Sequence, residues 1–252
     1  MIATTSLAQS VTPTIKAYFT DSYCFDLSGA KVLAVEPHDS SDKHLRIILD
    51  RTIFHPQGGG QPSDTGSIIF PETGLVFNVE ALQYNRDTGV ISHIGQFSDG
   101  EQLSNGVERL KPGHIANLSI DEAARRTNCR LHSAGHFLDL MMKQVRPELV
   151  PGSGSHATGM SWVNYTGDVP AAERNLVRDA LQEAVNKHLA VPVAVQIEMN
   201  ESTMRRSIQF GSFESCECGG THVRNSDEIG KINITKIAKN GKNGVRVSYT
   251  VE

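Results

Sequence analysis

The sequence predicts an α+β protein, in which a small N-terminal β-barrel is followed by an α/β part. Short runs rich in β-branched residues recur from about Thr14 to Asn117, with Gly, Pro, Asn and Asp between them, and this spacing is typical of a small barrel. From Asp121 onward the apolar residues instead recur at helical intervals. We therefore expect two domains, covering residues 1–118 and 119–252.

The strands of the first domain are expected in five stretches, each bounded by turn-forming residues. Strands this short and this regularly spaced favour a barrel over βαβ units, which need helical segments between the strands. The stretches are KVLAVEP, LRIILD, GSIIFPETG, LVFNVEAL and GVISHIG.

The second domain is expected to begin with two helices. The first spans 121–145, where Leu131 and Leu138 lie on one face, with acidic residues in its first turn. The second spans 170–189 and starts at Pro170.

Three further segments with regular structure are expected after these helices. VPVAVQIEM is interpreted as a buried strand, and ESTMRRSIQF as a short helix. The final stretch, KINITKIAKNGKNGVRVSYTVE, alternates like a pair of strands around an Asn- and Gly-rich turn.

The composition narrows the class of protein. No apolar run approaches the ~18 residues of a membrane span, and the N-terminus resembles no targeting signal, so we expect a cytoplasmic protein that makes no membrane contact. The formal charge of -4 gives no overall basic face, so any RNA contact must come from local patches. Four cysteines are too few for a disulfide scaffold, which leaves metal binding or burial.

Two pairs of side chains are candidate metal ligands. His132 and His136 are four apart on the first expected helix, so both rings project from one face. Cys218 and His222 repeat this spacing downstream, and three imidazoles with one thiolate form a suitable tetrahedral zinc set. The alternative is a buried thiol beside a hydrogen-bonded histidine. Two other cysteines offer substitute ligands or buried apolar groups, namely Cys129 and Cys216.

The segment DRTIFHPQGGGQPSDTG contains three consecutive glycines, Gly58 to Gly60. A tight turn between barrel strands would account for its glycines. It is not a phosphate-binding P-loop, because no Gly-Lys-Ser/Thr follows.

HSAGHFLD followed by CGGTHV resembles the HxxxH and CxxxH pair of the editing domain in alanyl-tRNA synthetases and AlaX-type editing proteins, which is related to that of threonyl-tRNA synthetases. The ending GGTHV, with Thr221, resembles the motif of the alanyl branch, because the threonyl branch usually has proline at this position. The glycine-rich segment also resembles an alanyl-family motif, although His55 stands where tyrosine is usual and Gln57 where glutamate is common. The two signatures together cover nearly the whole chain.

The resemblance implies a zinc-dependent aminoacyl-tRNA hydrolase with a two-layer α/β editing domain, in the medium, freestanding form of this family. It would act in trans on mischarged tRNA(Ala), removing serine and, second, glycine, and no protein partner is expected. Zinc would activate water or only position the ester, and four protein ligands mildly favour positioning. The alternatives are a non-catalytic, zinc-stabilised tRNA-binding module and a threonyl-type editing hydrolase.

The expected site residues fall into three groups. The metal-binding and catalytic group is His132, His136, Cys218 and His222. The substrate-binding group is Gly58, Gly59, Gly60, Gln61, Ser155 and Thr221, with Ser153, His156 and Thr158 as further candidates for the contact to a serine hydroxyl. The tRNA-binding group, which is also compatible with a merely solvated basic surface, is Arg125, Arg126, Arg130, Lys236, Lys239 and Arg246.

Overall fold

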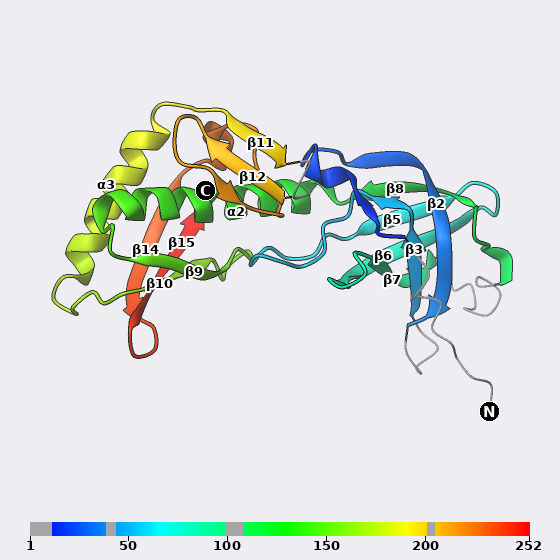
Figure 1. Cartoon of the computed structure of the whole chain (residues 1–252), viewed down its shortest axis with the longest axis horizontal. Helices are drawn as coiled ribbons and strands as arrows, with labels where there is room; N and C mark the ends of the chain where they lie inside the picture. The colour runs from blue at the N-terminus through cyan, green and yellow to red at the C-terminus, as the bar shows by residue number, and fades with distance from the viewer. Residues whose placement is uncertain (1–11, 39–43, 99–107, 201–204) are drawn as a thin grey trace. The chain divides into compact units, whose positions relative to one another are not determined.

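The computed structural model describes residues 12–38, 44–98, 108–200 and 205–252, and the chain forms two compact units (Figure 1). The first unit contains Met1–Gln57 and Ser63–Arg125, and the second contains Gly58–Pro62 and Arg126–Glu252. The glycine-rich segment is thus divided, and its central part lies in the second unit. The domain boundary expected after residue 118 stays a prediction.

The first unit is built on a closed barrel of six strands, in the order β2-β3-β7-β6-β5-β8, as the sequence predicts. Neighbouring strands pair in antiparallel register around the barrel. Its strands are β2 (Asp26–Pro37), β3 (Leu45–Leu49), β5 (Gly66–Phe70), β6 (Leu75–Tyr84), β7 (Ile91–Phe97) and β8 (Ile115–Ile120). Two short strands, β1 (Ile15–Lys16) and β4 (Arg51–Thr52), pair in parallel, and a 3-10 turn, η2 (Ala17–Phe19), follows β1.

The interior of the barrel is filled by alternate side chains of its strands, because successive residues of a strand point to opposite faces. Aliphatic and aromatic residues occupy these inward positions and are buried. They include Val32, Leu45, Ile47, Ile68, Phe70, Phe77, Val79, Ala116 and Leu118.

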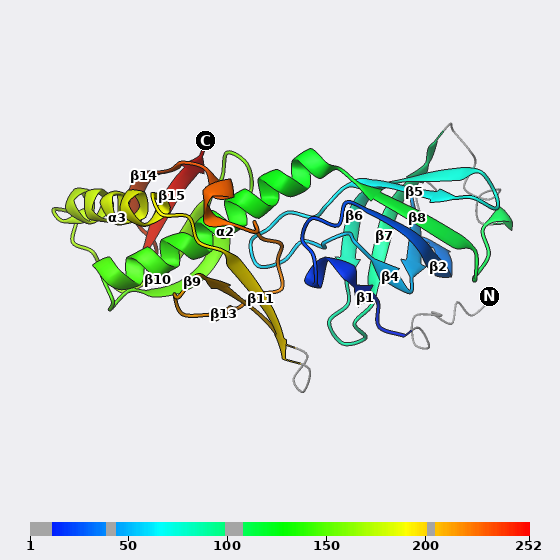
Figure 2. The same cartoon turned by 90° about the horizontal axis from the view of Figure 1, so that it is seen from above.

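The second unit places two helices against an antiparallel sheet of order β14-β15-β10-β9 (Figure 2). Gln182 of the second helix donates to the carbonyl of Ile232, and the Tyr249 hydroxyl in the sheet donates to the carbonyl of Leu131 in the first helix. A smaller sheet has the order β11-β12-β13. The bounds are α2 (Glu122–Val145), β9 (Val150–Ser155), β10 (Trp162–Thr166), α3 (Arg174–Leu189), β11 (Val195–Asn200), β12 (Arg205–Phe210), β13 (Cys216–Glu217), η4 (Ser226–Ile229), β14 (Ile232–Lys239) and β15 (Gly244–Val251).

A capping side chain precedes the first helix, and a turn precedes the second. The Asp121 carboxylate accepts a hydrogen bond from the amide of Ala124, which caps the start of α2. The second helix begins later than Pro170, at Arg174, because the intervening residues form a turn closed by the amide of Glu173 on the Pro170 carbonyl.

Two sequence predictions in the second unit are wrong. Residues 205–210 form strand β12 and not a short helix, because Arg206, Ile208 and Phe210 alternate inward; residues 201–204 of that prediction lie outside the described residues. The strand predicted from 191–199 exists as β11, but most of its residues are exposed or half-exposed, so it is not a buried strand.

None of the helices in the described part of the chain combines the length and apolar composition needed to cross a bilayer.

Candidate metal centre

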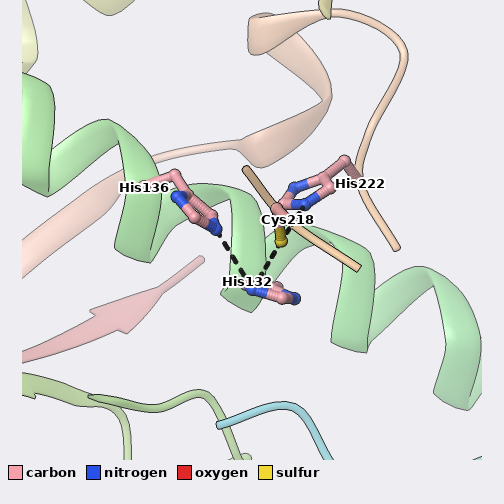
Figure 3. A group of neighbouring side chains, drawn as sticks. All are labelled: His132, His136, Cys218 and His222. Carbon is pink, nitrogen blue, oxygen red and sulfur yellow. Dashed lines mark hydrogen bonds between the residues drawn. The ribbon is translucent and has the colours of Figure 1, made fainter. Parts of the chain in front are cut away.

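Four side chains from two stretches of the second unit converge (Figure 3): His132 and His136 on α2, and Cys218 and His222 after β13. Their ligand atoms all lie within 4.8 Å of one another. The His132 Nε2 atom is 3.2 Å from the His136 Nε2 and 3.6 Å from the Cys218 Sγ, which in turn is 3.2 Å from the His222 Nε2.

The three individual distances are close to those of a tetrahedral metal site. Bonds of about 2.0–2.1 Å to nitrogen and about 2.3 Å to sulfur place tetrahedral ligand atoms about 3.3–3.6 Å apart. Burial, assisted by the charge of Arg206, lowers the pKa of His136 to about 4, so its ring is neutral near pH 7, as a metal ligand must be. The four residues could therefore hold one metal ion.

Gln61 fixes the orientation of the His132 ring. Its Oε1 atom lies 2.7 Å from the His132 Nδ1 and accepts the amide proton of Thr221 at 2.9 Å, while its Nε2 donates to the Thr221 hydroxyl at 2.8 Å. Since Oε1 is an acceptor, the His132 Nδ1 carries the proton. The lone pair of its Nε2 therefore points towards the other three candidate ligands.

The positions of Gln61 and Thr221 correct the substrate-binding prediction for both side chains. Each has 0% of its surface exposed, and their polar atoms are engaged with each other and with His132. They support the His132 ring from behind and have no surface left for a substrate.

The other two histidines have partners of the same kind. The His136 Nδ1 is 3.3 Å from the Cys216 Sγ, and the His222 Nδ1 is 3.1 Å from the Ser133 hydroxyl, which also accepts the Val223 amide proton. Such outer contacts hold ligating rings in a fixed orientation.

Neither further cysteine joins the four ligands. Cys216 contacts the outer nitrogen of His136, and burial raises the pKa of its thiol to about 12. The buried Cys129 donates to the Thr221 hydroxyl at 3.2 Å. Cys216 therefore contacts a candidate ligand, and Cys129 contacts the residue that is hydrogen-bonded to Gln61.

Two glycines are required by close approach at this centre. A Cβ atom on Gly220 would overlap the His132 ring, and one on Gly60 would collide with the carbonyl of Gly154. Gly60 also has a φ of +80°, which disfavours other residues. The turn itself is closed by hydrogen bonds in both directions between the backbones of Gly58 and Gln61.

Arg206 is a buried residue that the sequence analysis did not single out. Its Nη1 atom donates to the carbonyls of Cys218 and Gly220, both at 2.8 Å, and so holds the loop that carries Cys218. The alternation of Arg206 with Ile208 and Phe210 could have revealed it, had the segment been recognised as a strand.

The candidates for a serine contact differ in accessibility. His156 is buried, its ring stacks on His132 with centroids 4.8 Å apart, and its Nδ1 lies 2.7 Å from the Tyr249 hydroxyl. Ser155 is half-buried at the end of β9, whereas Ser153 and Thr158 are exposed.

The basic residues separate into buried and exposed ones. Arg125 is fully buried: its guanidinium pairs with the Asp64 carboxylate and donates to the carbonyls of Ser22 and Ile53, so its assignment to tRNA binding is wrong. Arg130 donates to the carbonyls of Ile229 and Glu252.

The remaining basic candidates are accessible. Arg126, Lys236 and Lys239 are exposed. The Arg246 guanidinium lies 3.8 Å from the centroid of the Trp162 ring, and its Nε donates to Asn164.

Comparison with known proteins finds a family match that includes Cys218 and His222, and relatives that cover most of the chain. Residues 206–248 match the threonyl and alanyl tRNA synthetase second additional domain. The chain is 30% identical to the alanyl-tRNA editing protein AlaX-M of Pyrococcus horikoshii, over 95% of this chain and 98% of the relative. It is 29% identical to AlaX-M of Methanosarcina barkeri, over 93% of this chain and 97% of the relative. An alanine–tRNA ligase of Saccharolobus islandicus is 27% identical over 94% of this chain but only 26% of the ligase.

Proposed function

This chain belongs to the family of alanyl-tRNA editing proteins, and on that premise we propose that it hydrolyses the ester that joins a wrongly attached amino acid to tRNA(Ala). We propose serine as the main amino acid removed, glycine as the second, and zinc as the metal held by His132, His136, Cys218 and His222.

The observation that carries this proposal is the convergence of the four ligand atoms within 4.8 Å, with a hydrogen-bond partner on the outer nitrogen of each histidine. Three imidazoles and one thiolate are donors that zinc prefers, and the distances of 3.2, 3.6 and 3.2 Å between neighbouring ligand atoms are close to those of its tetrahedral geometry. A bound zinc ion would supply Lewis acidity or a fixed point for holding the ester.

The protein's own groups have two proposed tasks at this site. The backbone of Gly58–Gly60, which has no side chains to obstruct it, would receive the aminoacyl end. Ser155, half-buried at the end of β9, is the proposed partner for a serine hydroxyl. A polar partner at this place favours serine over alanine, because alanine would leave it without a hydrogen bond.

The tRNA would be held by the accessible basic residues. Lys236, Lys239, Arg126 and Arg246 are proposed to contact its phosphates, which position an RNA without reading its bases. Arg125 has no part in this, since it is buried against Asp64.

The test is a panel of charged tRNAs given to zinc-loaded and zinc-stripped protein. We expect zinc-dependent deacylation of seryl- and glycyl-tRNA(Ala), with alanyl-tRNA(Ala) spared. The His132→Ala and Cys218→Ala variants should lose this activity while remaining folded, and Cys24→Ala is the matched cysteine control, because Cys24 lies in the first unit.

Two results would contradict the proposal. Tight tRNA binding without cleavage of any ester would indicate a binding protein and not an enzyme. A preference for seryl-tRNA(Thr) would indicate threonyl-type specificity.

A further inference from the structure

A cavity of about 390 Å³ lies next to the candidate metal centre, within the second unit. The metal-ligand candidate His136 and its outer partner Cys216 form part of its wall. Most of the remaining wall is apolar, including Leu149, Ile208 and Phe210. Its volume is in the range of pockets that take up small ligands.

Asp139 places a carboxylate in this apolar wall. It follows His136 by three residues on α2, so both side chains lie on one face of the helix, about 5–6 Å apart at their Cβ atoms. The buried Tyr165 hydroxyl donates to the Asp139 Oδ1 at 2.7 Å, which fixes the carboxyl group.

No cation is paired with this carboxylate among the ion pairs of the described residues. The cationic residue of the cavity wall, Lys143, instead pairs with Glu214, and both are exposed. Burial raises the pKa of Asp139 to about 7. A cation bound beside it would offset the lost hydration of the ionised carboxylate.

We infer that the Asp139 carboxylate binds the α-ammonium group of the aminoacyl ester, an inference that rests on the proposed function. In such an ester the nitrogen is attached to the carbon next to the ester carbonyl. A carbonyl held at the metal centre would thus bring the ammonium within reach of a carboxylate one helical turn from His136.

This assignment gives the cavity a selective role. Asp139 recognises the charge that every free aminoacyl group carries, whichever amino acid is attached. An ester whose α-nitrogen is acylated lacks that charge and would bring an unpaired amide into the same place, so it is rejected.

The test compares two adenosine analogues with a stable amide at the 3′ position, one carrying a seryl group and the other its deaminated glyceryl counterpart. Zinc-loaded wild-type protein should bind the seryl analogue roughly tenfold to a hundredfold more tightly, as expected for a hydrogen bond to a charged group. In Asp139→Asn, which keeps an acceptor for Tyr165, this preference should disappear, while binding of the glyceryl analogue stays within about twofold.

Glu214→Gln is the matched control, since it removes a carboxylate from the exposed rim of the same cavity and should leave the preference unchanged. Equal weakening of both analogues by Asp139→Asn would overturn the inference and assign Asp139 a structural role.

The outcome is separable from that of the proposed function. Wild-type protein that hydrolyses seryl-tRNA(Ala) but binds both analogues equally would refute only the ammonium contact. Protein that prefers the seryl analogue through Asp139 yet leaves seryl-tRNA(Ala) intact would support the contact and refute the hydrolysis.

Discussion

The Gln61 Oε1 atom lies 2.7 Å from the Nδ1 of His132, although the two residues are 71 positions apart in the chain. Removing this acceptor should release the His132 ring. For Gln61→Ala we expect zinc affinity to fall about tenfold to a hundredfold, the usual effect of losing such an outer partner. Competition with a chromogenic chelator measures it, with the exposed Gln57→Ala as the control. Unchanged affinity in Gln61→Ala would remove this role.

Cys218 and Cys216 should respond differently to substitution, because only the first belongs to the four ligands. We expect Cys218→Ala to lower the amount of zinc that copurifies with the protein. Cys216→Ala should retain zinc but release it more readily, since it frees only the outer nitrogen of His136. Elemental analysis and chelator competition distinguish the two effects, and equal zinc loss in both variants would count against the ligand assignment.

Gly220→Ala should disturb the centre by steric overlap, because its Cβ would enter the space of the His132 ring. We expect a loss of about 1–3 kcal/mol in the free energy of unfolding, typical of overpacking, together with weaker zinc binding. Gly152→Ala is the control, since its Cβ would meet only the Asn164 carbonyl at 3.4 Å. Denaturant unfolding gives both values, and equal stability of the two variants would refute the close approach.

Arg125 should matter for stability and not for tRNA binding. Arg125→Met leaves the buried Asp64 carboxylate without its cation, which costs about 3–5 kcal/mol. The neighbouring Arg126→Met removes an exposed side chain, and we expect a change within about 0.5 kcal/mol. Urea unfolding measures both, and a near-neutral Arg125→Met would mean that the ion pair contributes little.

His93 should make the stability of the barrel depend on pH. Burial lowers its pKa to about 4 from an ordinary value of 6.5, so the folded state holds this proton more weakly than the unfolded chain. Its contribution to stability is therefore fully present above about pH 6.5 and is lost as the pH falls towards 4, by an amount on the order of 3 kcal/mol.

Urea unfolding of the wild type and His93→Gln between pH 7 and pH 4 tests this expectation. The variant should show a shallower decline, whereas His114→Gln, at a half-exposed site in the same unit, should follow the wild type. Parallel curves for all three proteins would exclude His93 as the source of the pH dependence.

Local patterns in the sequence predict the barrel, the first helix and the two pairs of candidate ligands. Each depends on spacing along one stretch, such as the four-residue interval between His132 and His136. The error at 205–210 arose because Arg206 is polar, so its inward position was not recognised. Its burial is stabilised by two carbonyls in a loop that the sequence does not show to be near.

The residues that surround the four candidate ligands could not be predicted in the same way, because their roles depend on contacts between residues far apart in the chain. Composition gives no reason to choose Gln61 over Ser155 as the residue behind a ligand. Asp139 likewise shows nothing unusual in the sequence, since its environment is created by strands that follow α2. The fully buried Arg125 looked like a surface residue because its partner, Asp64, is far away in the chain.

The placement of Gly58–Pro62 in the second unit also affects the order in which the centre forms during synthesis and which parts of the gene can be exchanged. During synthesis this short piece leaves the ribosome well before the helix that carries His132, so the centre is completed only when an early segment joins a late one. A fragment that begins at residue 119 would retain all four ligands but lack the amide that orients His132. The first half of the gene therefore cannot be exchanged as an independent cassette without removing part of the unit that carries the four candidate metal ligands.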